Sequence, residues 1–322
     1  MKNTPDYTML YRIAKSYYLD NMSQQQIARQ ENISRPHVSR LLAKARECGI
    51  ANVTVEIPQE LRMSSLQEDL KQKLRIEDVL LVYVPEEHQN DNLKVSKNIA
   101  TIASEHMAEL LSKAYHIGIG WGYTVYQTAL LMPNIKLKNA ATFIPLVGMS
   151  DESNPYLQSN VIVDRFAEKF GALSYYTSVP AFYENSTTRQ KTESDRYSRL
   201  KQQWEKLDAA VIGLGPKFKS GSFLISEVSP EYKALIAGSD AVGDILANFF
   251  REDGSIVDSV AYYEQVSLPL RQLKKIKTVI CVAGGESKVP GIIAAAKNHY
   301  IKTLITDNNT AKMILERLNQ TK

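Results

Sequence analysis

The sequence predicts an α/β protein in which a small all-α domain precedes a large domain built on a doubly wound parallel sheet. Three observations support this prediction. Two short amphipathic helical patterns, separated by a tight polar break, lie within residues 22–49. Further along, helical patterns alternate with short apolar runs, which is typical of a parallel sheet covered by helices on both faces. The 322 residues are 44% hydrophobic and 23% charged, a composition that suits more than one globular domain.

The small domain is predicted as three successive helices. Apolar residues recur at helical spacing over residues 7–20, which indicates the first helix. Ser23 and Gln26 have the spacing of a capping box, so the second helix is expected to begin there. Ser34 is a suitable N-cap for the third helix, and Pro36 is tolerated in its first turn because no intrahelical hydrogen bond is lost there.

The third helix is expected to have one apolar and one basic face. Its apolar positions are Val38, Leu41, Leu42 and Ala45. Between Met22 and Arg46 the chain has five basic residues and one acidic residue, Glu31. The whole chain has a net charge of only +4, so this local cluster must supply any attraction to a polyanion. An ordinary solvated helical hairpin is the alternative interpretation.

The pattern of residues 22–46 fits a helix-turn-helix, whose second helix presents its N-terminal side chains to the major groove. Double-stranded DNA is therefore the expected partner. The residues best placed for base edges are His37, Ser39 and Arg40. Those expected at phosphates are Gln24, Gln25, Arg35, Lys44 and Arg46. Ser34 and Pro36, at the start of the helix, complete the predicted DNA-binding set.

The boundary between the domains is predicted at Pro58, which gives domains of residues 1–58 and 59–322. Gly49 is expected to end the third helix. The alternation of apolar residues at positions 53, 55 and 57 predicts a short strand before the boundary.

Helix and strand then alternate from the start of the large domain. Ser65 and Glu68 form another capping-box pattern, which predicts the start of a helix. The run "DVLLVYV" that follows is expected to be a fully buried strand.

Three apolar runs of the large domain end in glycines. "YHIGIGWGYTVYQTALL" is predicted to pass from a strand through Gly118, Gly120 and Gly122 into a helix capped by Thr124. "DAAVIGLGP" ends in Gly213 and Gly215, and "TVICVAGGESK" in Gly284 and Gly285. Backbone N–H groups at such a turn, together with the helix dipole, favour an anion. Glycines that serve only to make a tight turn are the alternative. The absence of GxGxxG and P-loop spacing argues against a dinucleotide or ATP.

Ligands of parallel sheets bind beyond the carboxyl ends of the strands, where all three glycine turns are expected. Lys288 would add a cation at this edge, and Asp244 a carboxylate that accepts from sugar hydroxyls. An anion joined to a polyol is therefore the predicted ligand. A surface lysine and a helix-capping aspartate are the alternatives.

The sequence offers no support for a metal site, a cofactor or catalysis. The five histidines have no paired metal-ligand spacing, and none lies in a glycine turn. Cys48 and Cys281 lack CxxC spacing and are expected to be buried thiols in a reducing compartment. The longest apolar run, residues 79–84, is far below the ~18 residues of a membrane span, so no membrane contact and a cytoplasmic location are expected.

Nearly the whole chain resembles the SorC-type sugar-binding transcriptional regulators of bacteria, the DeoR/SorC group. The motifs that carry the resemblance, in the family's order, are "YYLDNMSQQQIARQENISRPHVSRLLAKARECGI", "GIGWGYT", "DAAVIGLG", "AVGDILANFF", "VAGGESK" and "LITDNNTAKMIL". The resemblance implies an N-terminal helix-turn-helix and a C-terminal effector domain related to phosphosugar isomerases. It also implies a phosphorylated sugar as effector, which changes the affinity for operator DNA, and assembly into homodimers or homotetramers.

The resemblance assigns ligand-binding residues by motif. Those of the phosphate loop are Gly120, Trp121, Gly122, Tyr123 and Thr124. Those near the sugar are Gln158, Asn160, Asp244 and Lys288. The chain departs from the usual pattern at Ala247, Asn248 and Arg251.

A regulator of a carbohydrate-utilisation operon is the function that the sequence favours. A phosphosugar isomerase-like enzyme with an appended DNA-binding segment is the alternative, and would need a base near the sugar carbonyl. The carboxylates that could serve are Asp164, Asp208 and Asp244. A purely structural nucleic-acid protein would leave the large domain unexplained.

Overall fold

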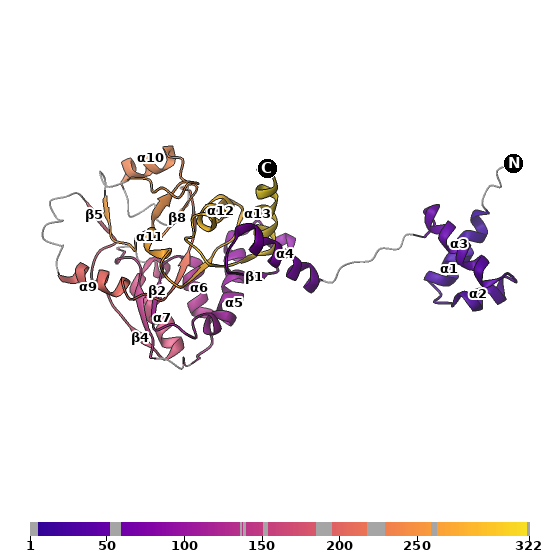
Figure 1. Ribbon diagram of the computed structural model, residues 1–322, viewed down its shortest axis with the longest axis horizontal. Coiled ribbons are helices and arrows are strands. Elements are labelled where there is room, and N and C mark those ends of the chain that lie inside the picture. The colour runs from indigo at the N-terminus through magenta and orange to yellow at the C-terminus, as the bar shows by residue number, and fades with distance from the viewer. Residues whose placement is uncertain are drawn as a thin grey trace. The chain divides into compact units, whose positions relative to one another are not determined.

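The computed structural model describes residues 6–51, 59–135, 137, 140–150, 154–184, 195–217, 229–258 and 263–320. The chain divides into two compact units, Met1–Pro58 and Gln59–Lys322, which are drawn in Figure 1. The strand predicted around residues 53–57 lies outside the described residues. In the described part of the chain, no helix combines the length and the apolar character that a bilayer crossing requires.

In residues 6–51 the first unit forms three helices, α1 (Tyr7–Tyr18), α2 (Gln24–Gln30) and α3 (Arg35–Glu47). The predicted caps are confirmed: Ser23 and Gln26 form a capping box, and the Ser34 hydroxyl accepts from the His37 N–H. Gly49 ends α3 with φ +72° and donates its N–H to the Arg46 carbonyl, as expected of a helix stop. Buried apolar side chains from all three helices form the core: Leu10, Ile13, Ala14, Ile27, Ala28, Val38, Leu42 and Ala45.

The second unit is built on a parallel sheet of seven strands in the order β1-β12-β11-β6-β2-β3-β4, flanked by helices. The strands are β1 (Asp78–Val82), β2 (His116–Ile119), β3 (Thr142–Pro145), β4 (Leu173–Ser174), β6 (Ala209–Gly213), β11 (Thr278–Val282) and β12 (Thr303–Asp307). The helices are α4 (Gln59–Leu74), α5 (Asn92–Leu110), α6 (Tyr123–Leu131), α7 (Ser159–Phe170), α9 (Asp195–Trp204), α10 (Pro230–Gly238), α11 (Leu270–Leu273), α12 (Val289–Lys297) and α13 (Asn308–Gln320). The predicted parallel α/β fold is confirmed.

Two smaller sheets and short helical turns complete this unit. An antiparallel sheet has the order β7-β8-β9, and β5 pairs with β10. Their bounds are β5 (Phe182–Glu184), β7 (Gly215–Pro216), β8 (Gly243–Ile245), β9 (Asn248–Phe250) and β10 (Tyr263–Gln265). The 3-10 turns are η1 (Glu86–His88), η2 (Pro155–Leu157) and η4 (Glu286–Lys288). Since β7 begins two residues after β6 ends, the small sheet continues from the carboxyl edge of the large one.

Two predictions at the start of this unit were wrong. Helix α4 begins at Gln59, so Ser65 and Glu68 lie inside the helix, because the preceding residues include strong helix formers such as Glu60, Leu61 and Arg62. Strand β1 is not fully buried: Val79 is buried and its neighbours are half-buried. Its place at the edge of the sheet, where it pairs with β12, explains this exposure.

The two cysteines are both free, but they differ in burial. Cys281 lies in β11 and is buried, which raises the pKa of its thiol to about 12. Cys48 follows α3 and is half-buried, so the expectation of two buried thiols holds for one of them.

Candidate functional site

The residues predicted to contact DNA lie on the outside of α2 and α3. Those exposed are Gln25, Ser34, Arg35, Pro36, Ser39, Arg40 and Lys44, and those half-buried are Gln24 and His37. On the opposite side of α3, Val38, Leu42 and Ala45 are buried in the core. The helix therefore offers a continuous polar and basic surface while its apolar face holds it in place.

A single ion pair neutralises the acidic residue that lies within this segment. Arg12 of α1 binds Glu31 through two hydrogen bonds, Nε–Oε1 at 2.9 Å and Nη2–Oε2 at 2.6 Å. The Glu31 side chain is 11% exposed, so the pair is partly shielded from water. This contact ties α1 to the turn after α2 and leaves the positive field of α3 unopposed by Glu31.

A second ion pair on α3 escaped the sequence analysis. Lys44 Nζ lies 2.9 Å from Glu47 Oε2, and both side chains are exposed. The hydrogen bond to Glu47 is the main reason that the pKa of Lys44 is raised. Any phosphate that approaches Lys44 must compete with Glu47. The spacing of three residues on a helix was the available signal.

The carboxyl edge of the large sheet has a topological switch point between β2 and β6. From β2 the chain continues outward to β3 and β4, whereas from β6 it continues in the opposite direction to β11 and β12. Such a reversal leaves a crevice beyond the strand ends, and ligands of open α/β sheets bind there. The turn from Gly120 to Thr124 follows β2, and Gly213 ends β6. The two segments touch, since a Cβ at Gly213 would lie 3.3 Å from the Trp121 carbonyl oxygen.

The turn after β2 is shaped by backbone hydrogen bonds. Gly120 donates its N–H to Val211 and Gly122 donates its N–H to Tyr156, both at 2.8 Å. Gly122, with φ +116° and ψ 158°, is the N-cap of α6, so the expectation that Thr124 caps this helix was wrong. Thr124 instead lies buried in the first helical turn. The N–H groups at the start of α6, which lack intrahelical acceptors, are the donors that this turn can offer to a ligand.

Four α-helix N-termini of the large unit lack a side-chain cap, within the described residues. They belong to α6, α7, α11 and α12. By contrast, the helices α1, α2, α3, α5 and α10 are each capped by an aspartate or serine side chain. Among described atoms, none lies within 4 Å of a Cβ built on Gly122. The start of α6 therefore combines open space with a partial positive charge, which suits an anion.

Gln158 and Asn160, at the start of α7, lie near this turn, but their side-chain amides already form hydrogen bonds within the protein. Gln158 Nε2 donates to the Ser150 carbonyl at 3.0 Å. Asn160 donates to the Thr177 carbonyl at 2.8 Å and accepts from the Thr177 N–H at 3.1 Å. The Asn160 amide thus holds the segment after β4 against α7.

Asp244 and Lys288 form a second polar group beyond β6 and β11. Asp244 lies in β8 opposite Gly215, where a Cβ would overlap Asp244 Oδ1, so only glycine fits at that position. Asp244 is 8% exposed, and its burial raises the pKa of the carboxyl to about 7, although the Ala247 N–H and Lys288 oppose the shift. Burial lowers the pKa of Lys288, opposed by Cys281, Asp244 and Asp307.

Gly284 and Gly285, the remaining predicted glycines, are buried and form the turn that carries Lys288. Gly285 has φ +103° and donates its N–H to the Thr310 hydroxyl at 2.7 Å. The structure therefore brings the three glycine turns to one sheet edge, after the neighbouring strands β2, β6 and β11. It also adds a partner from α13, Thr310, that the sequence did not indicate.

A strained hairpin turn covers the strand ends. Leu246 and Ala247 connect β8 to β9 with φ values of +55° and +60°, although such turns normally use Gly, Asn or Asp. The Leu246 carbonyl accepts from Gln265 Nε2 at 2.6 Å and from Asn248 Nδ2 at 3.2 Å. A Cβ at Gly120 would lie 2.9 Å from the Leu246 side chain.

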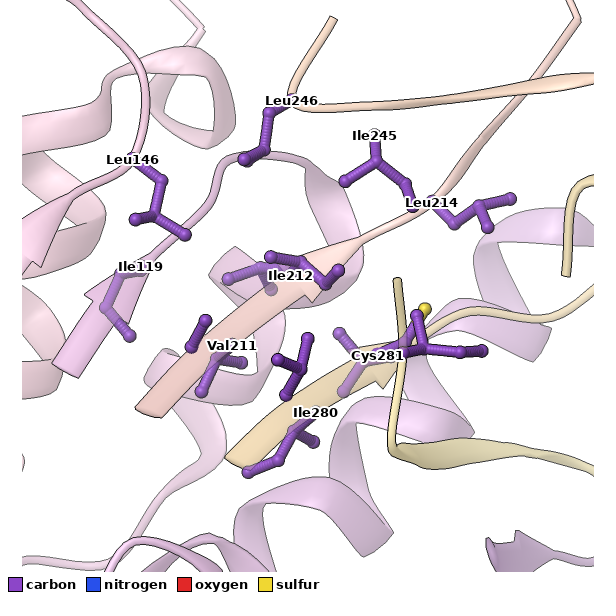
Figure 2. Close-up of a cluster of buried hydrophobic side chains, with 14 of the residues drawn as sticks. Ile119, Leu146, Val211, Ile212, Leu214, Ile245, Leu246, Ile280 and Cys281 are labelled. Atoms are coloured by element: carbon purple, nitrogen blue, oxygen red, sulfur yellow. The ribbon is translucent and has the colours of Figure 1, made fainter. Parts of the chain in front are cut away.

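Apolar side chains of this turn continue the core of the sheet. Figure 2 shows Ile245 and Leu246 together with Val211 and Ile212 of β6, Ile280 and Cys281 of β11, and Ile119 of β2. The β8–β9 turn therefore covers the carboxyl ends of these strands, and its position affects the space next to Gly120. Asn248 supplies one of the hydrogen bonds that hold the turn.

Comparison with known proteins identifies the family. The family described as "Putative sugar-binding domain" matches residues 59–316. The chain belongs to the SorC/DeoR group of sugar-binding transcriptional regulators. The predicted membership is confirmed.

Relatives of this SorC/DeoR-group protein match along their whole length. The deoxyribonucleoside regulator of Bacillus subtilis strain 168 is 31% identical over 95% of this chain and 96% of its own length. The sorbitol operon regulator of Klebsiella pneumoniae is 27% identical over 98% of this chain and 100% of its own. The crystal structure of full-length SorC from Klebsiella pneumoniae matches with a TM-score of 0.71 and 26% identity, covering 97% of this chain and 100% of that one. These relatives are named as regulators.

Proposed function

We propose that this SorC/DeoR-group protein binds operator DNA of a carbohydrate-utilisation operon in the cytoplasm, with an affinity that a phosphorylated sugar controls. The observation that carries the proposal is the switch point between β2 and β6, where the uncapped start of α6 lies at the same sheet edge as the group formed by Asp244 and Lys288. The N–H groups at the start of α6 suit a phosphate, and the side chains of Asp244 and Lys288 suit the hydroxyls of a sugar. The names of the relatives support a regulatory role.

DNA binding is assigned to the outer face of α2 and α3. Base contacts are proposed for His37, Ser39 and Arg40, which are exposed or half-buried near the start of α3. One helix-turn-helix makes few contacts, so tight binding requires two copies on half-sites about 34 Å apart or a multiple of this. The protein should therefore act as a homodimer or homotetramer. A monomer in sedimentation that protects a single half-site at nanomolar affinity would contradict this assembly.

Isomerase-like catalysis receives little support from the three candidate bases. Asp208 accepts from the Tyr115 and His116 N–H groups, at the amino end of β2 and away from the switch point. Asp164 is exposed on α7 and is engaged by Ser174 and Tyr176. Asp244 alone lies at the carboxyl edge, and burial raises the pKa of its carboxyl to about 7, a value that suits a general base, so it is the one candidate that keeps this alternative open.

The test uses the full-length protein and operator fragments that the protein selects from genomic DNA. Operator affinity is measured by fluorescence anisotropy with and without glucose 6-phosphate, fructose 6-phosphate, sorbitol 6-phosphate, 2-deoxyribose 5-phosphate and their unphosphorylated parents. At least one phosphate ester should change operator affinity while its parent sugar does not. The same ester at 100 times its Kd should raise the free energy of unfolding by about 2.7 kcal/mol. Equal effects of an ester and its parent would refute the phosphate assignment.

A further inference from the structure

The turn that carries Lys288 is connected to helix α13 by a chain of buried hydrogen bonds. Gly285 donates its N–H to Thr310 Oγ1 at 2.7 Å, and this hydroxyl donates to Asp307 Oδ2 at 2.5 Å. Thr310 and Asp307 are each 1% exposed, so water does not compete for these bonds. The Thr310 hydroxyl acts as both acceptor and donor, and so connects Gly285 to Asp307.

Asp307 has two structural tasks at once. Its Oδ1 accepts from the Asn309 and Thr310 N–H groups at 3.0 and 2.9 Å, which makes it the N-cap of α13. Its Oδ2 would lie 2.5 Å from a Cβ at Gly284, so the turn and the cap are in direct contact. The hydrogen bonds through Thr310, together with this contact, link a shift of the glycine turn to a shift of the first turn of α13.

Helix α13 in turn packs along α4, the first helix of the large unit. Lys73 of α4 donates to Asn319 of α13 at 3.1 Å, near the other end of α13. In sequence, α4 follows residues 52–58, which connect it to the helix-turn-helix unit. The contacts therefore run from the Lys288 turn through α13 to the helix at which the DNA-binding unit is attached.

We propose that Thr310 is a positioning residue that couples the Gly284–Lys288 turn to the α13–α4 helix pair, so that ligand at the turn alters operator affinity through it. This inference rests on the proposed function. An occupied site fixes the Lys288 turn, Thr310 transfers that position to the cap of α13, and α13 moves against α4. Without the hydroxyl the turn and the helix respond separately.

The test compares operator affinity, with and without saturating sugar phosphate from the panel above, in Thr310→Val and in the wild type. The valine keeps the branched shape but removes both hydrogen bonds of the hydroxyl. Coupling between two sites typically changes affinity by about 5–150-fold, and this ratio should fall at least about fivefold in the variant. Operator affinity without ligand should stay within about twofold of wild type. By reciprocity, the ratio of the sugar phosphate affinities for free and operator-bound protein should fall by the same factor in the variant.

Two controls separate coupling from a general loss of structure. Thr303→Val, at the start of the same strand β12, alters a buried threonine that takes no part in this chain of bonds and should keep the full response. Thr310→Ser retains the hydroxyl and should restore the response. An unchanged ratio in Thr310→Val at saturating ligand overturns the inference, as does an equal loss in Thr303→Val.

A measurement on the wild-type protein covers the case in which Thr310→Val does not fold. Addition of the active sugar phosphate should slow amide hydrogen exchange in the first turns of α13 and in α4, and unchanged exchange in both helices overturns the inference. If no phosphate ester of the panel alters operator affinity of the wild type, the proposed function fails and this inference fails with it. A wild type that responds, beside a Thr310→Val variant that responds equally, removes this inference alone.

Discussion

Replacement of Gly122 by valine separates the two roles assigned to the turn after β2, its role in the fold and its role in binding phosphate. Gly122 has φ +116° and ψ 158°, a backbone region that is essentially restricted to glycine. A β-branched residue there should cost about 1–3 kcal/mol of strain. No clash adds to this cost, because a Cβ at Gly122 has no described atom within 4 Å. The variant should therefore fold, with a melting temperature lowered by about 2–4 °C for each kcal/mol.

The loss of ligand should be much larger than the loss of stability. The open space beside Gly122 is where the proposed phosphate approaches the N–H groups of Tyr123 and Thr124. Two hydrogen bonds to a charged group contribute about 1.5–3 kcal/mol each, so their loss should weaken binding by at least about 100-fold. Isothermal titration calorimetry with the active sugar phosphate measures this change. Operator affinity in the absence of ligand should remain that of the wild type.

Gly49→Val is the matched control for backbone strain. Gly49 also has a positive φ, +72°, and no described atom within 4 Å of its Cβ position, but it lies at the end of α3. This control should lose a comparable amount of stability in the small unit and keep its affinity for the sugar phosphate. Wild-type affinity and response in Gly122→Val would refute the phosphate assignment and leave Gly122 as a turn residue only.

Three further predictions concern DNA contacts and proton binding. Arg40→Ala should weaken operator binding by about 1–3 kcal/mol and relax the preference at one base pair, as measured on operators with single substitutions; unchanged affinity at low salt would move the recognition face elsewhere. Lys44→Ala should weaken binding to all DNA sequences alike. Glu47→Gln, which frees Lys44, should strengthen DNA binding and make it more dependent on salt concentration. No difference between wild type and Glu47→Gln would show that the Lys44–Glu47 ion pair does not compete with phosphate. The pKa of Asp244 is raised to about 7, so the folded state binds an extra proton between the ordinary carboxyl pKa near 4 and pH 7, and the free energy of unfolding should fall as pH rises through that range. Urea denaturation should show a flatter pH dependence in Asp244→Asn, and equal slopes would contradict the raised pKa.

Local signals explain why the small unit could be predicted almost completely. The cap at Ser34 and the stop at Gly49 depend on side chains and backbone within one helical turn, and the structure confirms both. Ser65 shows the limit of the same rule. A serine three residues before an acidic residue is a cap only if the helix starts there, and favourable residues before it let α4 begin earlier.

Alternation of helices and strands predicted the parallel sheet and placed the three glycine turns at its carboxyl edge. The order of the strands could not be predicted, since it depends on pairing between distant segments, and β1 was therefore expected to be fully buried although it lies at the edge of the sheet. For the same reason, the hydrogen-bond partners of the glycine turns could not be predicted. Gly122 bonds to Tyr156 and Gly285 to Thr310, residues that are far away in the chain and have no special local pattern.

The charges at the sheet edge favour the phosphate at one place and the sugar hydroxyls at another. The carboxyl groups of Asp244 and Asp307 are electrostatic neighbours of Lys288 and offset part of its positive charge. A phosphate placed against Lys288 would also meet those carboxylates, which disfavours a dianion there. At the start of α6, backbone N–H groups lie beside Gly122, and no described atom lies within 4 Å of its Cβ position. We therefore propose that the phosphate binds at the α6 turn and that Lys288 and Asp244 bind the hydroxyls of the sugar, whose arrangement distinguishes one sugar phosphate from another.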